Sequence, residues 1–61
     1  MRTSDLILAA TLQLKSALDP VVPILEQIAK TDPNYVEIAQ CYKVIRSELE
    51  KVATLLKEMP A

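Results

Sequence analysis

Between Tyr35 and Met59, an apolar residue recurs at every third or fourth position without interruption. The series is Tyr35, Ile38, Tyr42, Ile45, Leu49, Val52, Leu56 and Met59. Steps that alternate between three and four residues place every member on one side of an α-helix, as in coiled coils. The second half of the chain is therefore predicted to be one helix with a single apolar seam. Such a helix needs another helix to pack against.

The first half of the chain carries the same spacing. Its predicted seam positions are Ile7, Ala10, Leu14, Ala17, Val21, Ile24 and Ile28. Three polar residues before this series, Thr3, Ser4 and Asp5, offer side-chain oxygens that can cap the start of a helix. A helix over about residues 4–30 is therefore expected.

Two prolines, Pro20 and Pro23, lie inside this first pattern. Each removes a backbone donor and crowds the preceding turn. Because the apolar spacing continues through both, we expect a kink or short break at residues 19–23, with the second segment still roughly in line. Two separate helices are the alternative.

The boundary between the halves lies at residues 31–32. Asp32 is a good N-cap and Pro33 a good first helical residue, so a second helix is predicted over about residues 33–58. Pro60 disfavours helical geometry at Met59 and ends it. A turn this short makes the two arms antiparallel. The expected fold is all-α, an antiparallel helical hairpin that forms one domain over residues 1–61.

The eight residues Lys30–Glu37 resemble the junction between tetratricopeptide repeats. Lys43 stands where that family has a small glycine, and no second unit follows. Fewer than three such units are not stable alone. We therefore interpret the segment as capping chemistry at the turn and carry nothing over from that family.

Size makes self-association part of the expected fold. A chain of 61 residues buries only ~60% of its unfolded surface and usually needs a disulfide, a metal or a partner chain. One cysteine and no histidine exclude an internal disulfide and a zinc site. Association with another chain is the remaining means of stabilisation, and we expect two hairpins to dimerise into a four-helix bundle.

Six residues are assigned to a partner or dimer interface because the predicted seam does not bury them. They are Leu8, Leu12, Val36, Cys41, Val44 and Leu55. Leu8 and Leu12 fall on the polar side of the first arm. Cys41, Val44 and Leu55 form a stripe beside the main seam, with Glu48 among them, and this wider stripe is typical of a helix with more than one neighbour.

Composition argues against most other functions. The absence of histidine and glycine removes the usual nucleophile and phosphate-binding motifs, so we expect no enzyme activity and no cofactor. Seven basic and eight acidic residues give a net charge of −1, which provides no attraction to nucleic acid or anionic lipid. No apolar run reaches the ~18 residues that span a bilayer. The free cysteine and the lack of a targeting segment favour a cytoplasmic location.

The sequence therefore predicts a small protein-interaction module, a dimeric hairpin that binds and regulates a partner protein as an adaptor or inhibitor. A first alternative is a secretion co-chaperone. The two arms and the tyrosine that opens the second helix look like the small co-chaperones that help hold the needle subunit in type III secretion. A second alternative is a dimeric regulator that binds RNA or DNA, against which the near-neutral charge argues.

Overall fold

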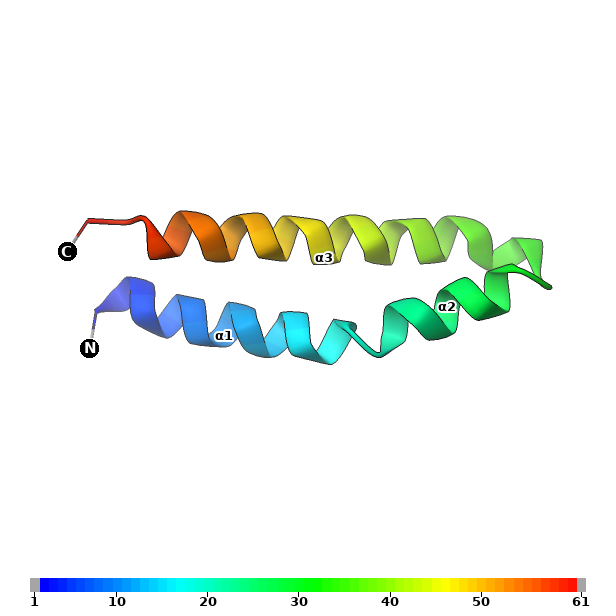
Figure 1. The fold of residues 1–61 in the computed structure, drawn as a ribbon, viewed down its shortest axis with the longest axis horizontal. Helices are drawn as coiled ribbons and strands as arrows, with labels where there is room; N and C mark the ends of the chain where they lie inside the picture. Colours follow the sequence, from blue (N-terminus) through cyan, green and yellow to red (C-terminus); the bar gives the residue numbers. More distant parts are fainter. Residues whose placement is uncertain (1, 61) are drawn as a thin grey trace.

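The computed structural model describes residues 2–60, which form two antiparallel helical arms (Figure 1). The first arm consists of α1 (Thr3–Leu18) and α2 (Val21–Ala29). The second begins with a short 3₁₀ turn, η1 (Pro33–Tyr35), that leads into α3 (Val36–Lys57). Residues 2–60 contain no strand, so the predicted all-α helical hairpin is confirmed.

The hairpin is long and thin, with extents of 48 × 15 × 11 Å. A single α-helix with its side chains is ~10–12 Å across. The molecule is therefore one helix thick, and the contact between the arms is the one place where side chains can be covered from both sides.

The start of α1 differs from the prediction. The helix begins at Thr3, and within the described residues no side chain caps its N-terminus. Asp5 instead pairs with Arg2, whose Nη2 lies 3.2 Å from Asp5 Oδ1. A carboxylate in the first turn also interacts favourably with the positive end of the helix dipole. The expected cap from Thr3, Ser4 or Asp5 is therefore wrong.

Asp19 and Pro20 separate α1 from α2. Both residues keep right-handed helical dihedrals, with φ values of −52° and −76°. Pro20 and Pro23 lack an N–H, so neither donates to the carbonyl four residues earlier. Because the dihedrals remain helical, the arm bends at this point and α2 continues along α3 (Figure 1). This is the short break that the apolar spacing indicated.

The turn is built as the sequence predicted. Asp32 Oδ1 accepts a hydrogen bond from the Asn34 amide at 3.0 Å, and Pro33 follows the cap. The amides of Thr31 and Asp32 both donate to the Ile28 carbonyl, at 3.1 and 2.9 Å. These bonds satisfy the groups that the ends of α2 and η1 leave free. They therefore fix the tight reversal of the chain.

A seam of buried and half-buried residues joins the arms. On the first arm it contains Ser4, Leu8, Thr11, Lys15, Leu18, Val22, Leu25 and Ala29, and on α3 it contains Ala39, Tyr42, Arg46, Leu49, Ala53 and Leu56. Small side chains are prominent among the most buried of these, including Thr11, Ala39 and Ala53. The Thr11 hydroxyl is satisfied by donating to the Ile7 carbonyl at 2.8 Å. Small residues let two helices approach closely.

The structure corrects the predicted seam. On the first arm Ile7, Leu14 and Ile24 are about half exposed. Ala10, Ala17 and Ile28 are also exposed, and Val21 is half-buried. On α3 the predicted residues Tyr42, Leu49 and Leu56 lie in the seam, whereas Tyr35, Ile38, Ile45 and Val52 are exposed.

The physical reason for this difference is the width of the apolar sector on each arm. A contact between two helices covers one stripe, and the apolar residues of each arm occupy more than one. The arms meet along the stripe that contains the small residues, so many large aliphatic side chains, such as Leu14, Ile24 and Ile45, remain outside the contact. Apolar spacing identifies the most apolar side of a helix but does not say which stripe the neighbour covers.

Candidate protein-binding face

Side chains that the seam leaves out, most of them apolar, form two stripes, one on each arm. The first-arm stripe is Ile7, Ala10, Leu14, Ala17, Val21, Ile24 and Ile28. The second-arm stripe is Ile38, Cys41, Ile45, Glu48, Val52, Leu55 and, beyond the end of α3, Met59. Both have the same three-four spacing, and all members except the half-buried Val21 are exposed.

An ion pair between the arms shows that both stripes lie on the same side of the hairpin. Lys43 Nζ on α3 lies 3.4 Å from Glu26 Oε1 on α2. Residues two positions apart on a helix point about 200° apart. Ile24 is two residues from Glu26, and Ile45 is two residues from Lys43, so both isoleucines lie on the side opposite the ion pair. We call this side the apolar face.

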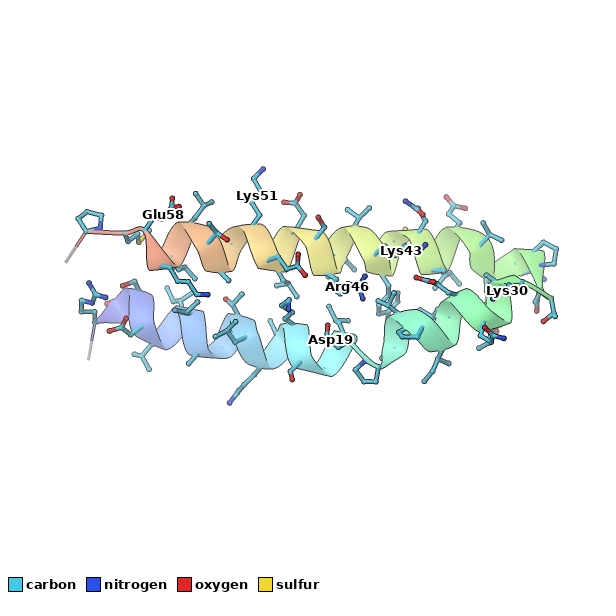
Figure 2. All side chains as sticks on the ribbon, viewed as in Figure 1. Asp19, Lys30, Lys43, Arg46, Lys51 and Glu58 are labelled. Carbon is cyan, nitrogen blue, oxygen red and sulfur yellow. The ribbon has the colours of Figure 1, made fainter. Side chains whose placement is uncertain are left out.

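The other side, the polar face, carries most of the charged and hydrogen-bonding residues near the seam. It contains Ser16, Asp19, Glu26, Lys30, Gln40, Lys43, Ser47, Glu50, Thr54 and Lys57. A second ion pair reaches this face, between Lys15 Nζ and Glu50 Oε1 at 3.8 Å. Figure 2 shows Lys43 and Arg46 close to the first arm, while Lys51 points away from it. The polar face thus combines acidic and basic groups that neutralise one another.

The six residues predicted for a partner interface are distributed over different surfaces. Cys41 and Leu55 belong to the apolar face. Leu8 is half-buried in the seam, which corrects the expectation that the seam cannot bury it. Leu12 is exposed, but it lies on the polar face.

Val36 and Val44 are exposed outside both stripes. Val36 is the first residue of α3, and Val44 lies on the outer side of this helix. A shallow hollow there is lined in part by Val44, Cys41 and Ile45. It extends the apolar face around the edge of α3.

The chemistry of this face is that of a contact surface. The described residues contain no group of three or more potential metal ligands. The Cys41 thiol is free and exposed. The Arg2 guanidinium hydrogen-bonds the Asp5 carboxylate and lowers the pKa of that carboxyl group, but this exposed pair belongs to the start of α1. The apolar face therefore presents mainly apolar side chains to a binding partner.

By length and composition alone, the first arm could also cross a membrane. The segment Thr3–Ala29 contains an 18-residue window with a mean hydropathy of 1.2, of which 11% is buried. Its apolar residues lie on several sides of the helix, since Leu8 faces the seam, Leu12 the polar face and Leu14 the apolar face.

No family model, curated protein or solved structure matches the chain. The geometry of the two faces is therefore the basis for a functional proposal.

Proposed function

We propose that this chain is a non-enzymatic protein-interaction module. Two hairpins associate through their apolar faces into a four-helix bundle, and the bundle binds and regulates a partner protein as an adaptor or inhibitor. The observation that carries the proposal is the apolar face, on which two stripes of identical spacing lie side by side and uncovered.

The exposed area of the single hairpin supports this association. A compact monomer of 6.8 kDa exposes on the order of 4,000 Å². The hairpin exposes 4644 Å², roughly 600 Å² more than that expectation. Each partner in a stable protein interface contributes about 800 Å². The excess is thus close to what one protein–protein contact removes from water.

The shape of the face favours a second copy over an irregular partner. Both stripes run along the whole hairpin, from Ile28 and Ile38 beside the turn to Ile7 and Met59 at the open end. To cover them, a partner must supply two helices of similar length with apolar residues at matching spacing. A second hairpin meets this requirement, and a two-fold dimer buries the same patch on both subunits.

We infer a regulatory role from the surface that such a bundle would present to other proteins. A protein that offers contact surface acts on other proteins by occupying their surfaces, often through apolar positions at helical spacing. After dimerisation, Val44 and Leu6 would still be exposed on the outer sides of the arms. These positions are available for a regulated protein.

Two leucines on α1 provide a matched test. Leu14, which is 57% exposed, lies on the apolar face, and Leu12, which is 43% exposed, lies on the polar face. We expect the wild-type chain to sediment as a dimer at micromolar concentration. Leu14→Glu should weaken association at least 100-fold, while Leu12→Glu should leave it within about threefold. Analytical ultracentrifugation measures both, and circular dichroism checks that each variant remains helical.

A wild-type chain that sediments as a folded monomer at high micromolar concentration would contradict the dimeric module. Equal effects of the two leucine substitutions would contradict the assignment of the apolar face. Recovery of the wild-type chain with lipid vesicles, with loss of that binding in Leu14→Glu, would show that the face binds a membrane and would overturn the proposal.

A further inference from the structure

The outer margins of the apolar face determine how a second copy can lie on it. An α-helix turns ~100° per residue, so alternate members of each stripe lie nearer to the seam and farther from it. The members farther from the seam form the two outer edges of the face. They are Ala10, Ala17 and Ile24 on the first arm and Cys41, Glu48 and Leu55 on α3, and all six are exposed.

The ion pair between Lys15 and Glu50 shows which residues of the two outer edges lie level along the hairpin. The arms are antiparallel, so a step toward the turn on one arm corresponds to a step toward the turn on the other (Figure 1). The level pairs are Ala10 with Leu55, Ala17 with Glu48, and Ile24 with Cys41. The ion pair between Glu26 and Lys43 agrees with this alignment to within about one helical turn.

A two-fold dimer can bring two apolar faces together in two ways. With the axis parallel to the helices, the first arm of each copy packs on α3 of the other, and both turns lie at the same end. With the axis across the helices, first arm packs on first arm, α3 packs on α3, and the turns lie at opposite ends. Neighbouring helices are antiparallel in both cases, so the outer edges decide between them.

The side chains of the outer edges fit the arrangement with the axis parallel to the helices. Each edge residue then meets, in the second copy, the residue that is level with it in its own hairpin. Facing positions that combine a small and a larger side chain fill the space between helices best. The facing pairs combine these sizes throughout: Ala10 meets Leu55, Ala17 meets Glu48, and Cys41 meets Ile24.

The arrangement with the axis across the helices fits less well. Ala17 and Glu48 are each the fourth of seven stripe positions, so complete overlap of the faces brings each of them against its own counterpart. Two alanines leave a gap, and two carboxylates repel one another across the contact. The first-arm stripe carries no charge, so α3 avoids this repulsion when it faces the first arm.

We propose that each first arm packs on α3 of a second copy, with both turns at one end of the four-helix bundle. This inference rests on the proposed function, because it takes a second copy as the occupant of the apolar face. The Glu48 carboxylate then lies at the border of the contact, on the side of Lys51, and keeps its water. Tyr35 and Val36, which are exposed beside the turn, are brought together from both copies at one end.

Cys41, the single cysteine of the chain, tests the arrangement through disulfides between copies. It faces Ile24 of the second copy in the proposed arrangement and Leu55 of the second copy in the alternative. Disulfides form only between residues whose Cα atoms lie within about 7 Å. With an added oxidant, we expect Ile24→Cys to give at least tenfold more covalent dimer than Leu55→Cys or wild type. Non-reducing gel electrophoresis measures the yield.

A charge exchange tests the contact between Ala17 and Glu48. Ala17→Glu sets a carboxylate against Glu48 of the second copy and should weaken the homodimer about tenfold. Adding Glu48→Lys to Ala17→Glu makes the facing charges opposite and should restore the dissociation constant to within about threefold of wild type. Ser16→Glu changes the polar face and is the control. Sedimentation equilibrium gives each constant, and circular dichroism monitors the fold.

The alternative arrangement predicts the opposite results. Each residue would then face its own counterpart, so the double substitution would oppose like charges at both positions and weaken the dimer further than Ala17→Glu alone. That result, or a yield of covalent dimer from Ile24→Cys no higher than from Leu55→Cys, would overturn the proposed arrangement and leave the dimer standing. A wild-type chain that sediments as a folded monomer would instead remove the proposed function, so the two failures are distinguishable.

Discussion

The two long faces of the hairpin are formed by the same two arms, but only on one of them do the side chains find partners within the chain. On the polar face, Lys43 pairs with Glu26, and Glu50 pairs with Lys15. On the apolar face, many large aliphatic side chains of both arms remain in contact with solvent. Two helices can therefore satisfy their charges within one chain, but they cannot bury two wide apolar sectors.

The two faces also differ in how much free energy they can contribute to stability. Exposed ion pairs each contribute roughly 0–1 kcal/mol, whereas burying a large aliphatic side chain contributes ~1.5–3 kcal/mol. The polar face therefore orients the arms without adding much stability. Burying the exposed aliphatic side chains of the apolar face would add further stability, and another chain is needed to bury them.

Adjacent leucines near the end of α3 should show the largest difference in stability between the seam and the apolar face. Leu56 is 8% exposed in the seam, and Leu55 is 56% exposed on the apolar face. Leu56→Ala should lower the free energy of unfolding by about 2–3 kcal/mol at any concentration, because it leaves a cavity between the arms. Leu55→Ala should change it by less than ~0.5 kcal/mol in dilute solution and by more under conditions of association. Urea unfolding at two protein concentrations separates the two effects.

The turn sets the register that keeps both stripes on one side. Asp32→Ala removes the acceptor for the Asn34 amide and should lower stability by about 1 kcal/mol. Asp32→Asn retains an acceptor and is the control. Thermal unfolding measures the difference. Equal melting temperatures for Asp32→Ala and wild type would show that Pro33 and the chain reversal suffice without the cap.

The ion pairs of the polar face should contribute less to the free energy of unfolding. A double-mutant cycle with Lys43→Ala and Glu26→Ala should give a coupling of about 0.2–1 kcal/mol that decreases with added salt. The same substitutions should leave the dimer dissociation constant within about threefold. A large change in that constant would mean that the polar face also takes part in association.

The smallest effect is expected at the start of α1. The hydrogen bond from Arg2 lowers the pKa of Asp5 in the folded chain. The stability it contributes is therefore present above the unfolded-state pKa and is lost as pH falls through the lowered folded-state value. Arg2→Ala should return the pKa of Asp5 toward its ordinary value, and Lys51→Ala should not. Nuclear magnetic resonance titration of the Asp5 carboxyl group decides between these outcomes.

Local signals in the sequence predicted the elements of the fold well. The Asp32-Pro33 pair located the turn, and Pro60 located the end of α3, because caps and prolines act on the residues beside them. Pro20 and Pro23 likewise located the break in the first arm. The start of α1 lies within one residue of the prediction, but the expected cap is wrong because Asp5 pairs with Arg2, which capping preferences alone do not indicate.

The pairing of stripes could not be predicted in the same way. The series that includes Ile7, Leu14 and Ile24 is entirely apolar, and an unbroken apolar series predicts the seam. The contact between the arms instead uses Thr11, Ala39 and Ala53, whose small size matters only once two helices meet. One sequence signal did indicate that apolar residues of α3 would remain outside the seam. Cys41 and Leu55 lie beside the main series, so the apolar sector of α3 is wider than one neighbouring helix can cover.

A hairpin with a thickness of 11 Å keeps none of its backbone far from water. Its amides are shielded by side chains of the two arms, so local opening exposes whole turns to proteases. An occupied apolar face would raise the free energy of that opening through mass action, since only the folded chain binds. Copies without a partner would then be degraded first. The cellular amount of this protein would in consequence follow the supply of whatever covers it.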